Sequence, residues 1–230
     1  PILVGSSEVR RVMEQLPEAA RVVVIGGGVM GCSTAYHLAR AGCRDVVLLE
    51  RHKLTSGTTW HSAAQVRTLR ASASLTRLIK YGVELYQSLE AETGQSTGWK
   101  NTGSLTVAGS ADRMTALRRM ASLARAYDVQ AEVLSAAEAK AIWPAIEAGD
   151  LHGAVRLPGD GRVNPSDLCA ALVKGAKALG VRFFEDTPVT GITLHNGRPS
   201  AVRTPAGDIR TETVVNCAGL WGAEVGALAG

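Results

Sequence analysis

The chain of 230 residues is 46% hydrophobic and 20% charged, and 25 Lys and Arg against 21 Asp and Glu give a net charge of +4. A chain of this length and composition can bury a sizeable core, which excludes a disordered tail, a coiled coil and a disulfide miniprotein. The basic residues are too dispersed for a nucleic-acid-binding surface. The longest uncharged stretch, residues 22–38, is shorter than a membrane span of roughly 20 residues. The composition indicates a soluble globular protein.

The cysteines carry no metal or disulfide pattern. Cys32, Cys43, Cys169 and Cys217 stand far apart, with no C-x-x-C pair and no histidine at ligand spacing. We therefore expect no metal site and reduced thiols in an intracellular compartment. The chain starts at Pro1 without a signal-peptide pattern and stops soon after a predicted strand, so we expect both ends to be cuts in a longer protein.

Residues 21–50 predict a βαβ unit. An apolar, β-branched run at 21–25 is typical of a strand buried on both faces of a parallel sheet. A glycine-rich turn follows, and residues 29–41 favour a helix that ends at Gly42. Residues 45–50 form a second apolar strand. The unit has the expected length of about 30 residues.

The rest of the chain alternates helices with short strands. Residues 74–92 predict an amphipathic helix whose apolar stripe consists of Leu75, Leu78, Ile79, Val83, Tyr86 and Leu89. The other helices are predicted at 111–127, after the capping box Ser135–Glu138 as far as Pro144, and at 164–179. Strands are predicted at 105–107, 131–134, 153–157, 181–184, 189–194, 200–204 and 213–217, and turns at 159–161, 196–197 and 205–208.

The sequence Gly26-x-Gly28-x-x-Gly31 matches a dinucleotide-binding turn. Gly26 permits the tight turn, Gly28 lets the backbone approach a pyrophosphate, and Gly31 allows close packing of helix on strand. Glu50 ends the second strand 50 − 31 = 19 residues after the last glycine, close to the ~20 expected for the residue that binds the ribose. A glycine-rich turn in an ordinary α/β domain is the alternative. The motif alone does not separate NAD from FAD.

Several stretches of the chain resemble one group of flavoenzymes. The chain is similar to the D-amino-acid-oxidase-like FAD amine oxidoreductases and, within them, to the sarcosine dehydrogenase and dimethylglycine dehydrogenase family. The most specific match is Leu-Thr-Ser-Gly-Thr-Thr-Trp-His at residues 54–61. The other matching stretches are residues 22–28, 36–39, 47–51, 90–94, 102–104, 159–161 and 214–221.

The resemblance implies a fold and an activity for the N-terminal part of such an enzyme. It implies an α/β fold (α+β overall), with a Rossmann-like FAD-binding domain at 20–97 and 164–230 and an inserted antiparallel substrate-binding sheet at 98–163. The implied reaction is demethylation of an N-methyl amino acid, sarcosine to glycine, by hydride transfer to flavin. Tetrahydrofolate would bind a C-terminal domain outside this chain, and an electron-transfer flavoprotein would accept the electrons. We expect this part alone to be inactive.

The resemblance also assigns cofactor-binding residues. In the family, the histidine at the position of His61 is covalently joined to the flavin, and a neutral imidazole is a suitable nucleophile for the flavin's 8-methyl carbon. The alternative is a loop histidine packed beside Trp60 with no bond to a cofactor. The remaining residues assigned to the cofactor are Arg51, Thr58, Thr59, Val189, Ala218 and Gly219.

Two arginines after His61 are candidates for substrate binding. Arg67 and Arg70 lie in a segment that the family places beside the flavin, where a guanidinium can bind a carboxylate with two hydrogen bonds. Arg70 matches an arginine of the sarcosine dehydrogenases, whereas dimethylglycine dehydrogenases tend to have histidine there. The alternative is a pair of solvated arginines.

Three other functions stay open at this point. A dimethylglycine dehydrogenase would share nearly every motif. A nicotinamide-dependent dehydrogenase would share the glycine turn but has no use for Trp60 and His61. A non-catalytic relative, such as the regulatory subunit of pyruvate dehydrogenase phosphatase, shares many stretches, and His61 argues against it. We expect the mitochondrial matrix if the source is eukaryotic, and the cytoplasm if it is bacterial.

Overall fold

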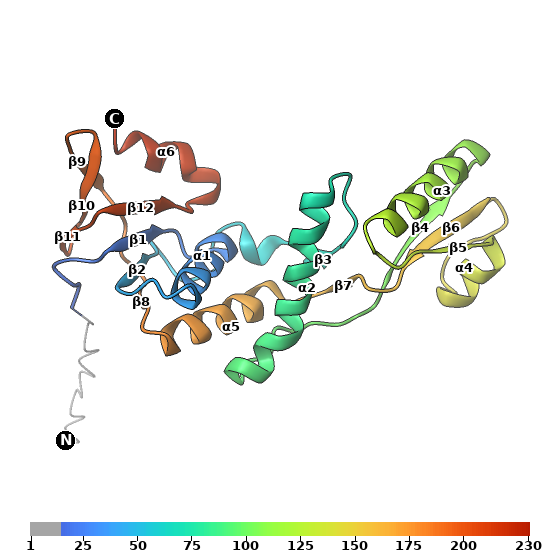
Figure 1. Cartoon of the computed structure of the whole chain (residues 1–230), viewed down its shortest axis with the longest axis horizontal. Helices are drawn as coiled ribbons and strands as arrows, with labels where there is room; N and C mark the ends of the chain where they lie inside the picture. Colours follow the sequence, from blue (N-terminus) through green and yellow to red (C-terminus); the bar gives the residue numbers. More distant parts are fainter. Residues whose placement is uncertain (1–14) are drawn as a thin grey trace, which may run out of the picture. The chain divides into compact units, whose positions relative to one another are not determined.

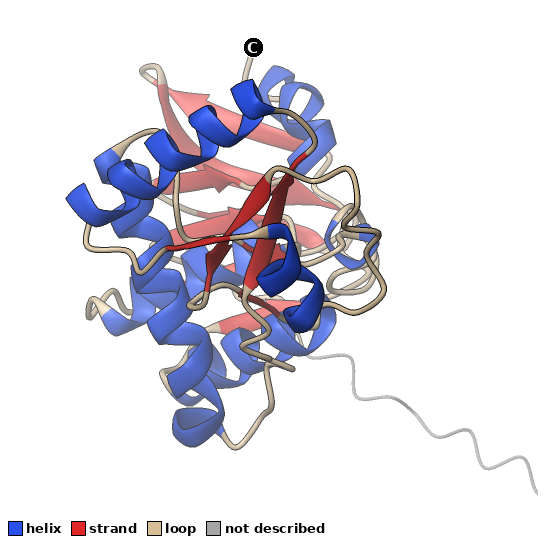
Figure 2. Ribbon diagram, turned by 90° about the vertical axis from the view of Figure 1, so that its right-hand side faces the viewer, coloured by secondary structure: helices blue, strands red, loops and turns tan. Residues whose placement is uncertain are grey.

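The computed structural model describes residues 15–230, which Figure 1 shows in colour. They form two compact units: residues up to 54 together with 179–230 make the first, and residues 55–178 make the second. Helices and strands alternate along most of the chain (Figure 2). We predict from the sequence that residues 20–97 and 164–230 bind the cofactor and that residues 98–163 bind the substrate. This division concerns function and stays a prediction. Among residues 15–230, no helix is both long and apolar enough to cross a membrane.

A four-stranded parallel sheet forms the centre of the first unit. Its order is β12 (Thr213–Asn216), β1 (Val22–Ile25), β2 (Val46–Leu49) and β8 (Arg182–Phe184). Every residue of β1 and β2 is buried, as an apolar run in a parallel sheet requires. Helix α1 (Val29–Arg40) connects the two strands. The predicted βαβ unit and the Rossmann-like fold class are confirmed.

An antiparallel sheet packs against the parallel one in the same unit. It consists of β9 (Gly191–His195), β10 (Arg198–Thr204) and β11 (Gly207–Arg210). Its apolar side chains join those of the parallel sheet in one core, which includes Val23, Val47, Ile192, Val202 and Ile209. The predicted turn at 205–208 is too long, because β11 already pairs with β10 from Gly207. The short helix α6 (Gly222–Ala227) was not predicted.

The second unit contains the predicted antiparallel sheet. Its order is β4 (Ser104–Ala108), β6 (Gly153–Leu157) and β5 (Glu132–Leu134). Helix α3 (Ala111–Ala126) covers one face, where Met114, Leu117 and Ala121 pack on Val155. Helix α4 (Ala136–Ile142) follows β5. A two-residue pair, β3 (Gln65–Val66) with β7 (Gly161–Arg162), was not predicted.

Helix α2 (Ala73–Thr93) buries less of its apolar stripe than its periodicity predicts. Leu85 and Leu89 are buried, but Leu75 is 52% and Leu78 is 63% exposed. A 21-residue helix is about 31 Å long, whereas α5 (Pro165–Ala178), which packs against it, has 14 residues and is about 21 Å long. The stripe therefore extends beyond the surface that α5 can cover.

The capping box of α4 gives a first testable expectation. The Glu138 N–H donates to the Ser135 hydroxyl (3.2 Å), and the Glu138 carboxylate accepts from the Ser135 N–H (2.8 Å). Replacing Ser135 by alanine should cost about 1 kcal/mol locally, so hydrogen-exchange protection in 136–142 should fall about fivefold. The matched control is Ser122→Ala, an exposed serine within α3. Unchanged protection in α4 would contradict the role of the cap.

The pKa of Glu138 gives the same cap a pH dependence. The hydrogen bond from the Ser135 N–H, and then that from its hydroxyl, lowers the pKa of this exposed carboxyl. A lowered pKa means that the carboxylate stabilises the folded state fully above the ordinary glutamate pKa, and less as the pH falls through the lowered value. The difference between Ser135→Ala and the unsubstituted protein should therefore shrink in acid.

Candidate functional site

The glycine-rich turn after β1 is packed too closely for larger residues at two of its positions. Gly26 has a φ of 110°, and a Cβ there would overlap the carbonyl oxygen of Cys217 at the end of β12. A Cβ on Gly31 would overlap the carbonyl oxygen of Gly26. The glycine-rich segment thus packs the start of α1 against the ends of β1 and β12, as the motif predicts.

The N-terminus of α1 follows the glycine-rich turn directly and carries no acidic residue. Gly28 is its N-cap residue, with an ordinary extended φ of −77°. Gly28 has no side chain with which to cap the helix, and no acidic residue lies in the first turn of α1. The N–H groups of the first turn of a helix and the positive end of the helix dipole favour a bound phosphate at such a position. This arrangement fits the pyrophosphate of a dinucleotide.

Glu50 fastens the glycine-rich turn, which the sequence did not predict. Its carboxylate accepts hydrogen bonds from the N–H of Gly27 (2.7 Å) and from the N–H of His52 (2.9 Å). The sequence motif assigned this carboxylate to a ribose. An ionised carboxylate has about four acceptor positions, so ribose hydroxyl groups can still bind beside the two N–H donors. Glu50 is therefore both a structural residue of the turn and a candidate ribose ligand.

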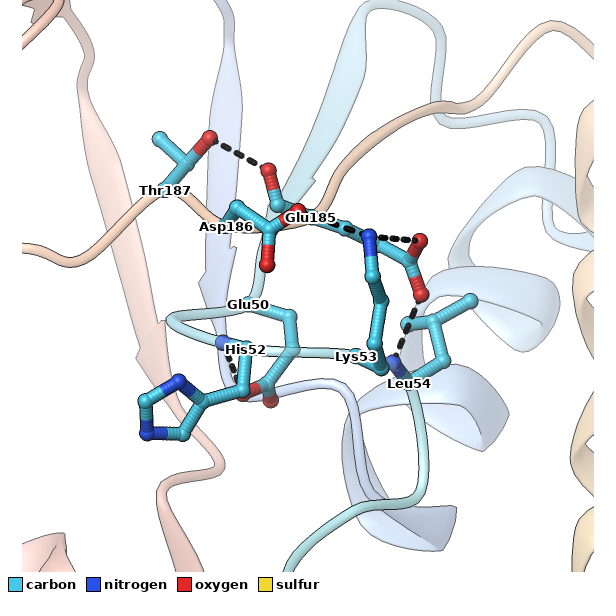
Figure 3. A network of polar contacts seen from close by, with 7 residues as sticks. All are labelled: Glu50, His52, Lys53, Leu54, Glu185, Asp186 and Thr187. Carbon is cyan, nitrogen blue, oxygen red and sulfur yellow. Dashed lines mark hydrogen bonds and ion pairs between the residues drawn. The ribbon is translucent and has the colours of Figure 1, made fainter.

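A polar network, drawn in Figure 3, fixes the loop after β2 to the segment after β8. Lys53 Nζ contacts Asp186 (2.6 Å) and Glu185 (3.3 Å), and the Leu54 N–H donates to Glu185 (2.8 Å). The hydrogen bond to Asp186 contributes most to raising the pKa of Lys53. The Asp186 N–H donates to the carbonyl of His52 (2.9 Å). The network supports the loop that begins at Glu50.

Arg51, Ala218 and Gly219 lie at the carboxyl ends of strands next to β1. Arg51 follows β2, and its guanidinium carbon lies 4.0 Å from the ring centroid of Trp221, which follows β12. The Ala218 backbone lies directly against Gly26. Gly219 has a φ of 59° and begins the 3-10 turn η2 (Gly219–Trp221). Because β12 and β2 flank β1, these residues border the glycine-rich turn.

Val189 lies in a loop, not in the predicted strand. The strand expected at 189–194 begins only at Gly191. Val189 is half-buried and packs on the core of the first unit. Its role at the adenine stays a prediction.

In the second unit, Thr59 and His61 lie in the 3-10 turn η1 (Thr59–His61), and Thr58 is its N-cap residue. His61 is exposed, and its Nδ1 lies 3.0 Å from the carbonyl oxygen of Gly57. A carbonyl oxygen only accepts, so Nδ1 carries the proton and Nε2 of the neutral ring keeps its lone pair. The centroids of the Trp60 and His61 rings lie 4.1 Å apart, and the two rings are tilted by 39°.

Arg67 and Arg70 have different surroundings. Arg67 is half-buried, and its Nη2 donates to the Thr106 hydroxyl on β4 (3.1 Å). Arg70 is exposed, and its Nη1 donates to the carbonyls of Arg67 (2.6 Å) and Leu69 (3.0 Å). Within residues 15–230, Nε and Nη2 of Arg70 have no hydrogen-bond partner. These two donors form the edge that binds a carboxylate bidentately.

The parallel sheet, its glycine-rich turn and the terminal Glu50 define a dinucleotide-binding α/β protein. The family model described as "FAD dependent oxidoreductase" matches residues 21–230. The chain therefore belongs to the FAD-dependent oxidoreductases, which confirms the family predicted from the sequence and identifies FAD as the dinucleotide.

Curated relatives and a solved structure are similar to nearly all of this chain. Mitochondrial sarcosine dehydrogenase of Mus musculus is 43% identical over 94% of the chain and 24% of its own length. The mitochondrial regulatory subunit of pyruvate dehydrogenase phosphatase of Mus musculus is 37% identical (92% and 24%), and mitochondrial dimethylglycine dehydrogenase of Rattus norvegicus is 34% identical (93% and 25%). The chain thus spans about a quarter of these relatives. L-proline dehydrogenase from P. horikoshii has a TM-score of 0.87, with 30% identity, over 93% of this chain and 56% of that one.

Proposed function

We propose that the protein oxidises a small N-methyl amino acid, sarcosine to glycine, with FAD as its cofactor. The observation that carries the proposal is the 43% identity to sarcosine dehydrogenases over 94% of the chain. FAD bound by the chain would accept a hydride from the N-methyl carbon of the substrate. Different residues of this chain would bind FAD and the substrate.

The residues of the first unit fit FAD. The N–H groups at the start of α1 would hold the pyrophosphate beside Gly28. Glu50 would accept from the adenosine ribose, and Arg51, Ala218 and Gly219 border the same turn. Val189 is proposed for the adenine. In the second unit, Thr58 and Thr59 are proposed to line the cofactor, and His61 to carry the flavin covalently through Nε2.

We propose that Arg70 binds the carboxylate of the substrate. Its two bonded carbonyls orient the guanidinium and leave the Nε–Nη2 edge as a bidentate donor. Arg70→Met in the intact protein should lower kcat/KM for sarcosine at least ~10-fold at equal flavin content, because hydrogen bonds to charged groups contribute about 1.5–3 kcal/mol each. Arg70→Lys should recover only part of the loss, because lysine lacks the fork.

The matched control for Arg70 is Arg119→Met, an exposed arginine on α3. It should leave kcat/KM unchanged. If Arg70→Met behaves like this control, Arg70 is a solvated surface arginine and takes no part in substrate recognition.

The substrate is tested by anaerobic reduction of the flavin in the intact protein. Sarcosine should bleach the oxidised flavin absorbance and yield formaldehyde, faster than dimethylglycine does. Faster bleaching by dimethylglycine would favour a dimethylglycine dehydrogenase. No bleaching by either amine, with no flavin retained, would favour a non-catalytic protein, as the 37% identity to the phosphatase regulatory subunit also allows.

The remaining proposals concern the rest of the reaction. By similarity to the sarcosine dehydrogenase family, we propose that tetrahydrofolate captures the one-carbon unit on a separate domain and that an electron-transfer flavoprotein accepts the electrons. The sarcosine dehydrogenases that the chain resembles are mitochondrial proteins. A matrix location in a eukaryote, or the cytoplasm in a bacterium, is proposed on that basis.

A further inference from the structure

Asp160 is a fully buried carboxylate in the turn between β6 and β7. Its side chain is 0% exposed, and among residues 15–230 no basic side chain forms an ion pair with it. It accepts hydrogen bonds from the Thr68 N–H (2.8 Å) and the Ser104 hydroxyl (2.6 Å). A buried charge without a counter-ion is costly, so its two hydrogen bonds must be held firmly in the folded state.

The backbone of Asp160 is itself fixed. Its carbonyl accepts from the Gly103 N–H (2.8 Å) and from the Asn101 side chain (2.7 Å), which also donates to the carbonyl of Pro158 (2.7 Å). The carboxylate is therefore a rigid point between the start of β4 and the segment that contains Thr68. This segment also carries the two arginines.

Arg67 and Thr68 are both linked by hydrogen bonds to one face of β4. Ser104 and Thr106 are two residues apart in a strand, so their side chains point to the same face. The Thr106 hydroxyl accepts a hydrogen bond from Arg67. The Ser104 hydroxyl donates to Asp160, which accepts from the N–H of Thr68, the residue that follows Arg67. The backbone beside Arg67 and the Arg67 guanidinium are thus held to the same strand.

The other end of the segment is fixed by a different residue. The Arg70 N–H donates to the hydroxyl of the buried Thr76 (3.1 Å), and the single hydroxyl proton of Thr76 is shared between the carbonyls of Ser72 (3.0 Å) and Arg70 (3.3 Å). Arg70 Nη1 in turn donates to the Arg67 carbonyl, one residue before the N–H that Asp160 holds. A displacement of Thr68 would therefore move the carbonyl that orients Arg70.

We propose that Asp160 is a positioning residue for carboxylate recognition: through Thr68 and Ser104 it fixes the segment on which Arg67 and Arg70 present their guanidinium groups. The proposal rests on the proposed function. It adds Asp160, Thr68 and Ser104 as residues that determine substrate affinity through the two arginines. Asp160 acts through the arginines and does not contact the substrate.

The test compares Asp160→Ala with Asp160→Asn in the intact protein at equal flavin content. Alanine removes both hydrogen bonds of the carboxylate. Because misplaced binding groups lower kcat/KM by about 10- to 100-fold, KM for sarcosine should rise by that factor. The value of kcat should stay within about twofold. Asparagine can accept from the Thr68 N–H and donate to the Ser104 hydroxyl, so it should restore most of the affinity. The matched control is Asp208→Ala, an exposed aspartate of β11.

A second readout separates this inference from the identity of the substrate. Acetate, the simplest carboxylate, should perturb the flavin spectrum on binding, and its Kd should rise in Asp160→Ala and recover in Asp160→Asn. This result supports Asp160 even if sarcosine fails to reduce the flavin, which would overturn only the proposed function. If Asp160→Ala does not fold, Ser104→Ala takes its place, with a smaller rise in KM and Kd. Unchanged KM and Kd, or a fall in kcat alone, would overturn the inference.

Discussion

Replacing Gly28 by valine should abolish FAD retention while the protein stays folded. Gly28 has an ordinary extended φ of −77°, which valine adopts readily, so the backbone of the turn is not strained. The side chain would instead occupy the space in which a phosphate meets the N–H groups of α1. Two lost hydrogen bonds to a charged phosphate correspond to about 3–6 kcal/mol, or at least ~100-fold in FAD affinity.

This choice of residue separates cofactor binding from folding. At Gly26 or Gly31, any side chain would overlap a main-chain carbonyl, so a lost cofactor there would also report a distorted turn. The flavin-to-protein ratio and the circular dichroism spectrum of Gly28→Val should be measured together, with reversible FAD titration in a His61→Ala background. Gly109→Val, at an exposed loop glycine with open space around it, is the control. Native FAD affinity in Gly28→Val would refute the assigned phosphate position.

The first βαβ unit could be predicted closely because local and long-range preferences agree there. The apolar strands β1 and β2 have no polar residue that would place one face in water, and the glycine spacing admits one kind of turn. The predicted bounds differ from the observed ones by a residue or so. Where a local pattern is this complete, the sequence determines both the element and its neighbours.

Helix α2 shows what periodicity leaves out. The predicted stripe indicates one apolar face, but the length of α5 decides how much of it is buried. The stripe consists of Leu75, Leu78, Ile79, Val83, Tyr86 and Leu89. A pattern along one helix contains no information about the length of its partner. The short strands β3 and β7 escaped prediction for a related reason, since two residues carry no period and pair only through the fold.

The candidate site divides in the same way. Residue types and spacing selected Gly26, Gly28, Gly31 and Glu50, but not the hydrogen bond by which Glu50 holds the Gly27 N–H. The sequence places Asp160 in a stretch that matches the family but predicts no role for it, because its partner Thr68 lies 92 residues away. A single sequence cannot reveal such a long-range hydrogen bond. An aspartate between two glycines does indicate a turn, and its carboxylate is a candidate functional group.

In the intact protein, the His61→Ala variant should release all of its flavin on acid denaturation, whereas the unsubstituted protein should keep it on the polypeptide. The geometry favours this residue because the Gly57 carbonyl accepts from Nδ1 and leaves Nε2 as the nucleophilic atom of an exposed ring. A tryptic peptide that contains His61 should carry the added mass of the flavin, and fragmentation should place that mass on the histidine. His61→Ala should show neither.

The matched control is His52→Ala. His52 is also an exposed loop histidine, but its contacts to Glu50 and Asp186 come from its backbone, which alanine retains. This variant should therefore keep its flavin covalently attached. A covalent bond should also raise the flavin's potential, which assists amine oxidation, so His61→Ala that still binds FAD should oxidise sarcosine more slowly than the parent protein. Complete extraction of flavin from the unsubstituted protein would show that His61 is only a loop histidine packed beside Trp60, and the non-covalent members of the family would then be the better models.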